Sequence, residues 1–330
     1  MSFESLLLPR TVSERALLAL AATAAAGAAC VSYGVLVEPR WYRRRRYRLE
    51  VLPHGATRSL TILHLSDLHF RARDGAKSRF IASLDRPDVT LLTGDIIGEP
   101  ESVETAVDAL RHIRGRLASI FVLGSNDYFA PKPLNYLSYF RGPRRRRKGT
   151  RNRTTDLIAQ LERDGWVHLA NRKSSLSRDG FRCEVVGMDD PHIGRHDLRV
   201  ATRTDRDAFG LAVVHSPDPA PELAALGYQL IVSGHTHGGQ VRLPFVGALV
   251  TNSQLPNRLA MGLSRMGPTL LHVSPGLGTS KFAPFRFLCR PEATFLELLP
   301  DRGDGTGRGD QRWGAVVAPA SATARSNTRS

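Results

Sequence analysis

The sequence predicts an α/β fold, and two observations carry that prediction. Short apolar runs alternate with segments in which apolar residues recur at helical spacing, and polar, glycine-rich segments follow many of the runs. The predicted strands are residues 60–65, 89–92, 120–123, 184–186, 211–214, 230–232, 241–243, 270–273 and 294–299. Helical spacing occurs at Val103, Ala106, Leu110 and Ile113, and again at Leu157, Ile158 and Leu161 before Gly165.

Composition supports a globular chain. The 330 residues are 42% hydrophobic and 23% charged, which excludes a wholly disordered, collagenous or multi-span membrane protein. The three cysteines, Cys30, Cys183 and Cys289, are too few and too scattered for a disulfide framework or a paired-cysteine zinc site.

The N-terminal region predicts a membrane anchor. After a tail at residues 1–15, residues 16–37 carry no charge, and 22 residues of helix are long enough to cross a bilayer. A cleaved signal peptide flanked by Arg10 and Arg15 is the alternative. We favour the uncleaved anchor, followed by a basic linker at residues 38–57 and a folded domain at residues 58–299.

The net charge of +15 is concentrated in two arginine-rich segments. Residues 40–48 hold six arginines, which predicts a cytoplasmic location for the folded domain and contact with anionic lipid head groups, with export as the alternative. Residues 141–153 hold eight basic residues and predict an exposed insertion loop. Nucleic acid is not the expected partner, because the sequence shows no nucleic-acid-binding motif beside the basic residues. Residues 300–330 are expected to be a disordered tail.

Potential metal ligands follow five of the predicted strands. Carboxylates and imidazoles two residues apart can converge on one ion, and the carboxyl ends of parallel strands share one sheet edge. The side chains at these strand ends are Asp67 and His69, then Asp95, then Ser125, Asn126 and Asp127, then His215, and finally His235 and His237. Their order predicts a metal site.

This order of motifs resembles the calcineurin-like metallophosphoesterase superfamily over residues 58–299. Residues 186–191, 235–244, 274–279 and 285–287 are further similar to its YkuE/YaeI-type branch of membrane-associated bacterial phosphoesterases. The resemblance implies a four-layer α/β/β/α sandwich of two mixed sheets, with a dinuclear metal centre at the strand ends.

The resemblance also implies roles for the motif residues. Asp67, His69 and His237 would hold one ion, His215 and His235 the other, and Asp95 would bridge the two. The ligand set suits two divalent ions of Mn, Fe or Zn, and a hydroxide held between them is the expected nucleophile. Asp95, Asn126 and His235 are the residues expected to act in catalysis.

The third motif departs from the family pattern of Gly-Asn-His followed by Asp or Glu. Here Ser125 stands at the position of the asparagine and Asn126 at the position of the histidine. In the family that histidine normally protonates the leaving group. Either Ser125 or a water replaces the ligand, or the turn shifts so that Asn126 supplies its amide; we favour the shift. His192 or His196 is a substitute acid or a solvated loop residue. Substrates with good leaving groups should therefore be cleaved best.

The expected function is that of a membrane-anchored phosphohydrolase acting on phosphodiester or pyrophosphate bonds. The anchor and its basic flank suggest a lipid-linked substrate, and the family includes enzymes that cleave UDP-diacylglucosamine. A catalytically weak, membrane-tethered protein that binds anionic ligands is the alternative. We expect structural roles for the remaining histidines, His54, His64, His112, His168 and His272. Asp127 is expected to be a cap or an ion-pair partner. Lys281 and Arg286 are expected to be substrate contacts or surface charges.

Overall fold

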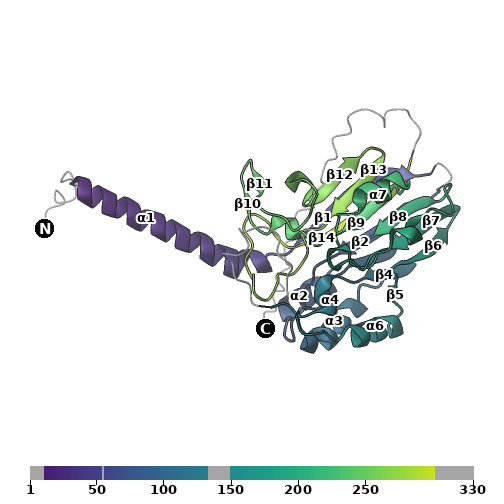
Figure 1. Cartoon of the computed structure of the whole chain (residues 1–330), viewed down its shortest axis with the longest axis horizontal. Coiled ribbons are helices and arrows are strands. Elements are labelled where there is room, and N and C mark those ends of the chain that lie inside the picture. The colour runs from purple at the N-terminus through teal and green to yellow at the C-terminus, as the bar shows by residue number, and fades with distance from the viewer. Residues whose placement is uncertain (1–10, 54–55, 133–148, 302–330) are drawn as a thin grey trace, which may run out of the picture.

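The computed structural model describes residues 11–53, 56–132 and 149–301. They form two six-stranded sheets packed face to face, with helices on the outer faces and one long helix projecting from the domain (Figure 1). Of the predicted segments, most of the tail at 1–15, most of the loop at 141–153 and nearly all of the tail at 300–330 lie outside the described residues, as does His54.

The first sheet has the strand order β1-β14-β2-β3-β4-β5. Neighbouring strands are parallel except for the antiparallel pair of β14 and β2. Its strands are β1 (Arg43–Leu52), β2 (Leu60–Leu65), β3 (Val89–Thr93), β4 (Ala118–Val122), β5 (Val167–His168) and β14 (Glu292–Pro300).

The second sheet has the order β12-β13-β9-β8-β7-β6. Its three central pairings are parallel, and the outer strands β12 and β6 pair antiparallel. Its strands are β6 (Arg172–Arg178), β7 (Phe181–Gly187), β8 (Phe209–Val213), β9 (Leu230–Ser233), β12 (Gly262–Met266) and β13 (Thr269–Val273). A separate hairpin joins β10 (Arg242–Leu243) to β11 (Gly247–Ala248).

Three apolar cores hold these layers together. Alternate residues of each strand point to opposite faces, so Ile62 packs between the sheets while Leu63 packs toward the helices. One outer core joins the first sheet to α2 (Gly75–Ala82), α3 (Val103–Arg111) and α6 (Thr154–Arg163). The other joins the second sheet to α7 (Ala220–Ala225). The expected four-layer α/β/β/α sandwich is confirmed.

The structure differs from the sequence expectation in the basic linker. Residues 43–52 of that stretch form β1, whose Tyr47 and Leu49 enter the core between the sheets. Two of its arginines are engaged by Glu292, which is 1% exposed: Arg43 Nε lies 2.7 Å and Arg45 Nε 3.0 Å from its carboxylate. Arg43 and Arg45 therefore neutralise a buried acid. The sequence does not indicate this role, because both residues stand in an unbroken run of arginines.

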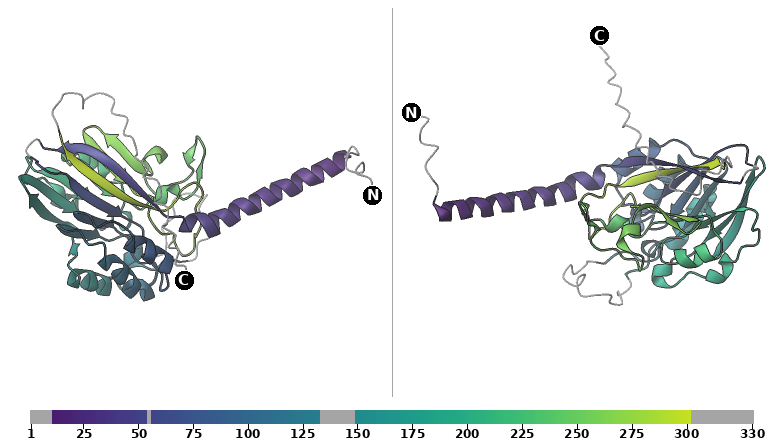
Figure 2. Two further views of the ribbon diagram at one scale, coloured as in Figure 1. Left: turned by 180° about the vertical axis from the view of Figure 1, so that it is seen from behind. Right: turned by 90° about the horizontal axis from the view of Figure 1, so that it is seen from above.

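The N-terminal helix is long and apolar enough to cross a membrane. It comprises α1 (Val12–Ser32), one π-helical turn at Tyr33–Val37 and a 3₁₀ turn at Glu38–Arg40. No residue of α1 is buried, and the helix projects freely from the domain in all three views (Figures 1 and 2). Its last turns dock against the domain, where Glu38 is fully buried and accepts hydrogen bonds from the backbone N–H groups of Leu288 and Cys289.

Candidate metal centre

The predicted carboxylate and imidazole ligands follow the carboxyl ends of β2, β3, β8 and β9, where the two sheets bring them together, and Asn126 follows β4. Five of the ten non-glycine residues with positive φ in the described chain are predicted ligands: Asp67, His69, Asp95, His235 and His237. Such backbone conformations are costly and persist where the surrounding structure enforces them, so their concentration here marks a functional site.

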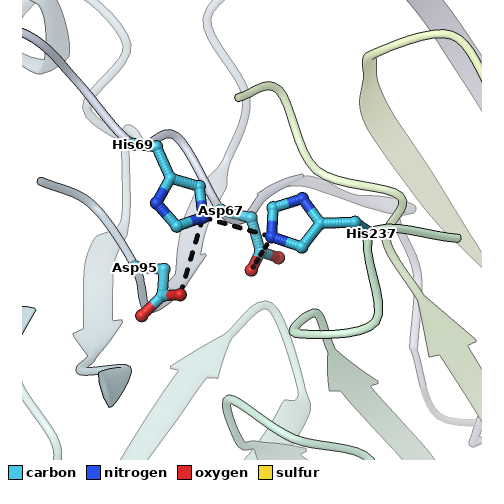
Figure 3. A group of neighbouring side chains, drawn as sticks. All are labelled: Asp67, His69, Asp95 and His237. Atoms are coloured by element: carbon cyan, nitrogen blue, oxygen red, sulfur yellow. Dashed lines mark hydrogen bonds and ion pairs between the residues drawn. The ribbon is translucent and has the colours of Figure 1, made fainter. Parts of the chain in front are cut away.

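Four side chains form one tight cluster. The ligand atoms of Asp67, His69, Asp95 and His237 all lie within 4.8 Å of one another (Figure 3). His69 Nε2 lies 3.1 Å from His237 Nε2 and 3.6 Å from Asp95 Oδ2. His237 Nε2 lies 3.5 Å from Asp67 Oδ1. Two imidazoles and two carboxylates facing one point form a ligand set that suits a divalent transition metal.

A second group stands on the other side of Asp95. His215 Nε2 lies 3.6 Å from Asp95 Oδ1, and His235 Nδ1 lies 3.3 Å from His215 Nε2. The two oxygens of Asp95 therefore face different imidazoles, with Oδ2 toward His69 and Oδ1 toward His215. The structure thus brings together all six residues that the sequence predicted as carboxylate or imidazole ligands.

Two of the imidazoles are held by hydrogen bonds from the ring nitrogen that points away from the cluster, as is usual for metal-binding histidines. His215 Nδ1 lies 2.7 Å from the Thr93 carbonyl, and His235 Nε2 lies 3.1 Å from the Asn252 carbonyl. Each contact places the ring proton on the outer nitrogen and leaves the inner one as a ligand.

Asp67 provides the clearest test of whether a cation fits. Its Oδ2 accepts hydrogen bonds from Ser66 Oγ at 2.6 Å and from the His235 N–H at 2.9 Å. Its Oδ1 is buried and receives no hydrogen bond from the described residues. A buried carboxylate oxygen without a donor is costly, so this atom fits the position of a metal ligand.

The glycine before His235 is needed for this approach. An added Cβ at Gly234 would lie 1.8 Å from Ser66 Oγ and 2.3 Å from Asp67 Oδ2. The loop after β9 can therefore reach the loop after β2 only without a side chain at this position.

Burial and charge both act on the titration of the cluster. Burial lowers the pKa of His69 to about 4 and also lowers that of His237, which keeps both rings neutral. Burial opposes ionisation of Asp95, but the positive charge of His215 and hydrogen bonds from Asn126 outweigh it and lower the Asp95 pKa. Burial would lower the pKa of His215, yet Asp95, Asp190 and Asp67 raise it to about 9. This excess of negative charge is the field that a cation would neutralise.

The third motif brings an asparagine rather than an imidazole to Asp95. The Asn126 backbone N–H donates to Asp95 Oδ1 at 2.8 Å, and the Asn126 side-chain amide contacts Asp95 Oδ2. Asp127, predicted to be a cap or an ion-pair partner, caps this turn by accepting the N–H of Gly124 at 2.9 Å. It also accepts the N–H of Ile96 at 2.8 Å and so joins the loops that follow β3 and β4.

The structure places three residues for which the sequence left alternatives open, and only Arg286 fits neither of its own. Arg286 is fully buried and donates to the carbonyls of Pro275, Gly278 and Cys289, so it fastens a loop and does not face substrate. Lys281 pairs with Glu99 at 2.8 Å. His192 is exposed, but its ring centroid lies 4.5 Å from that of His235, at the rim of the centre.

Asp190 is the site residue that sequence reasoning missed. It is fully buried, its Oδ2 receives no hydrogen bond from the described residues, and its charge raises the pKa of His215. The signal available in the sequence was the Asp189-Asp190 pair at the end of a predicted strand. His64 and His272 are buried in the core as predicted.

Comparison with known proteins agrees with this geometry. The profile of the calcineurin-like phosphoesterase family matches residues 60–239. The chain is 27% identical to the uncharacterized metallophosphoesterase YkuE of Bacillus subtilis, over 85% of this chain and 93% of that protein. It is 26% identical to the phosphodiesterase YaeI of Escherichia coli, over 85% of this chain and 97% of that protein.

A third relative carries a more specific name. The UDP-2,3-diacylglucosamine pyrophosphatase LpxG of Chlamydia trachomatis is 28% identical over 73% of this chain and 84% of that protein. With the family profile covering more than half of the sequence and the cluster of Asp and His residues in place, the chain belongs to the calcineurin-like phosphoesterase family and is a metal-dependent phosphoester hydrolase.

Proposed function

We propose that this chain is a membrane-anchored phosphohydrolase that uses two divalent ions to cleave phosphodiester or pyrophosphate bonds in lipid-linked substrates. Asp67, His69 and His237 would hold one ion, and His215 and His235 the other. Asp95 would bridge them, and Asn126, whose side-chain Nδ2 donates to Asp95 Oδ2, would stand beside the ions without being one of their ligands. Mn, Fe and Zn all suit this mixture of imidazole and carboxylate ligands.

The observation that carries the proposal is the position of Asp95. Its carboxylate is 3% exposed and stands between two groups of imidazoles, with one oxygen 3.6 Å from His69 and the other 3.6 Å from His215. A lone carboxylate in an ion pair needs only one such partner. Two imidazole groups on opposite oxygens are what a bridging ligand requires.

When bound, the two ions would supply an acidified water and would neutralise charge on the phosphoryl group. The chain's own residues position that chemistry. Ser66 and the His235 N–H hold the Asp67 carboxylate in place, while Thr93 and Asn252 fix the rings of His215 and His235. The Asn126 amide stands where the family places a proton-donating imidazole, so it can hold a substrate oxygen but cannot protonate a leaving group.

The lipid-linked substrate is supported by two features together. The helix Val12–Arg40 is long and apolar enough to hold the metal centre at a membrane surface. One relative is named as a pyrophosphatase for UDP-2,3-diacylglucosamine, a lipid-bearing pyrophosphate. We therefore propose this class of amphiphilic pyrophosphate or phosphodiester as the substrate.

Turnover of bis-p-nitrophenyl phosphate by the full chain tests the phosphodiesterase activity, with Mn²⁺, Zn²⁺ or Fe²⁺ added in turn. Asp95→Asn removes the negative charge that stands between the His69 and His215 groups. We expect turnover to fall by about 10³-fold or more. Asp85→Asn is the matched control, because that side chain is 70% exposed and lies outside the centre. It should leave turnover unchanged.

The same assay separates the proposal from a binding protein. Metal binding without turnover under all three metals would refute the hydrolase and favour a catalytically weak protein that holds anionic ligands. Hydrolysis of UDP-2,3-diacylglucosamine in mixed micelles tests the substrate class. Turnover of the nitrophenyl diester without turnover of this lipid would retain the hydrolase and refute the lipid-linked substrate.

A further inference from the structure

Exposed apolar side chains gather on the β10–β11 hairpin. Phe245 and Val246 at its tip are 109% and 66% exposed, and Leu243, Leu249, Val250 and Leu288 are also exposed. Of the other exposed large apolar residues in the described chain, Leu117 and Val167 lie elsewhere in the domain, and the rest lie on the N-terminal helix or at its base. A contiguous apolar surface of this kind marks an interaction site.

The hairpin stands at the end of the domain from which α1 leaves, in each of the views (Figures 1 and 2). Phe287 connects the two. Its carbonyl accepts the Arg242 N–H at 2.9 Å, and its N–H donates to the Gln240 carbonyl at 2.8 Å. Its ring packs edge-on against Tyr33 in the last turns of the helix, with centroids 6.1 Å apart. The hairpin and the helix base are therefore one connected surface.

The hairpin also carries positive charge. Its apolar residues line an open pocket together with Arg242 and Arg258, and no acidic residue is among the described residues of the lining. Arg242 donates to the Gly238 carbonyl at 3.0 Å, and Arg258 is exposed. Two guanidinium groups beside apolar side chains match a molecule that joins a phosphate to hydrocarbon.

The backbone at the tip reinforces this interpretation. Phe245 has a φ of 64°, a region that glycine adopts without strain and that a bulky aromatic residue adopts at a cost. The turn thus presents a fully exposed phenyl ring at a position where folding alone favours glycine. Burial of the ring in a bilayer would offset the cost of this backbone conformation.

We propose that the β10–β11 hairpin and Leu288 form a second membrane contact beside α1. Phe245 and Val246 enter the acyl boundary, and Arg258 with Arg242 binds the phosphate of an anionic phospholipid. This rests on the proposed anchoring of α1, because the helix sets which end of the domain faces the bilayer. The anchoring follows from the helix, whereas the second contact follows from the hairpin.

The contact places the metal centre against the membrane surface. The hairpin begins five residues after the proposed ligand His237, and the chain returns from it to Asn252, whose carbonyl lies 3.1 Å from His235 Nε2. A lipid held in the hairpin pocket would therefore lie against the segment that joins His237 to Asn252, with its phosphate beside Arg242 and Arg258. The hairpin would thus hold lipid substrates on the membrane side of the centre.

A fluorescent probe tests the contact in the full chain. Phe245→Cys, combined with Cys30→Ser, gives one reactive thiol, since Cys183 and Cys289 are buried. The protein is labelled with an environment-sensitive nitrobenzoxadiazole and placed in vesicles of phosphatidylcholine mixed with phosphatidylglycerol. We expect blue-shifted emission that nitroxide-bearing lipids quench. Val167→Cys is the matched control, with its exposed apolar side chain in β5, and its label should keep an aqueous spectrum.

The outcomes separate the contact from the anchor. A label at position 245 that stays aqueous while the chain resists carbonate extraction would overturn the hairpin contact and retain the anchor. Release by carbonate would overturn the anchor and, with it, this proposal. Arg258→Glu should weaken quenching in mixed vesicles only. Equal quenching with and without phosphatidylglycerol would overturn the assignment of Arg258 to a lipid phosphate.

Activity gives an independent measurement. Phe245→Ser with Val246→Ser should lose most turnover of a lipid phosphodiester embedded in vesicles, and keep turnover of bis-p-nitrophenyl phosphate, because neither residue touches the metal cluster. Unchanged turnover of both substrates would overturn the role of the hairpin. Absence of all turnover in the unaltered chain would refute the proposed hydrolase instead.

Discussion

At the scale of single residues, the chemistry depends on which atoms face Asp95. The Asn126 amide and backbone N–H both reach its carboxylate, and they reach it from the position where the family places an imidazole. The site can therefore hold a phosphoryl group without a built-in proton donor at this position. Leaving groups that need no proton should be favoured.

Asn126→His tests this directly. A positioned general acid contributes about 10²- to 10⁴-fold, so the variant should gain most on alkyl phosphodiesters and little on nitrophenyl diesters, whose leaving groups are already stable. The measurement is kcat/KM for the two substrates in the same preparations. His192→Gln, at the rim of the centre, is measured beside it. An unchanged ratio of the two substrates in Asn126→His would show that the missing imidazole does not limit the enzyme.

Two buried histidines make stability depend on pH. His272 lies 2.8 Å from His64 between the ring Nδ1 atoms, and burial, with Arg45, lowers the pKa of His272 to about 3. The folded protein resists protonation there, while the unfolded chain takes up a proton near pH 6.5. The stabilising effect is present above about pH 6.5 and is lost toward lower pH, by about 1.4 kcal/mol per pH unit.

We expect the free energy of unfolding of the full chain in detergent to fall between about pH 7.5 and about pH 5.5. In His272→Phe the fall should be smaller by about 1 kcal/mol, because one of the titrating groups is gone. Urea unfolding at both pH values gives the two free energies. An identical fall in both proteins would mean that His272 takes up its proton in the folded state.

Residue types predicted most of the candidate site. Carboxylates and imidazoles at strand ends could be identified because strand order places them at one edge, and all six converge. What the sequence could not show depends on packing from distant segments. Arg286 is buried because three carbonyls of its own loop surround it, and His192 reaches His235 only through the fold of the loop after β7.

At the scale of elements, the N-terminal helix and the loop before β14 form one unit. Gly34 has no side chain because an added Cβ would lie 2.2 Å from the Phe285 ring. Its carbonyl accepts the Arg286 N–H at 2.9 Å. The helix therefore ends on the same loop whose arginine fastens the segment behind Asp67.

Glu38→Gln should weaken this junction. One carboxylate oxygen accepts the Leu288 N–H at 2.8 Å and the other accepts the Cys289 N–H, whereas an amide presents only one acceptor. Leaving one buried donor unpaired costs about 1–3 kcal/mol of unfolding free energy. Glu50→Gln, on the exposed face of β1, is the matched control for urea unfolding in detergent. Equal stability of the two variants would contradict the account of the junction.

The elements differed in how well the sequence predicted them. The buried central strands were predicted because continuous apolar runs mark them. β1 was not, since four consecutive arginines conceal the alternation of Tyr47 and Leu49. β6 and β12 lie at the edges of the second sheet, where one face meets water and polar residues interrupt the apolar pattern.

At the scale of the whole molecule, two sheets bring their strand ends to one place. Asp67, His69 and Asp95 come from the first sheet, and His215, His235 and His237 from the second. Neither sheet alone contributes enough ligands for two ions. The sandwich thus makes the metal centre depend on correct packing of the core between the sheets, and the helix carries that centre at one end of the domain.

The central claim is that two ions share Asp95, and metal content per chain tests it most directly. Purified protein is saturated with Mn²⁺ or Zn²⁺, freed of excess metal and analysed by mass spectrometry of the element against protein concentration. The account predicts two ions per chain in the unaltered protein and a loss of bound metal in Asp95→Asn. A single ion per chain, or unchanged metal content in Asp95→Asn, would contradict it.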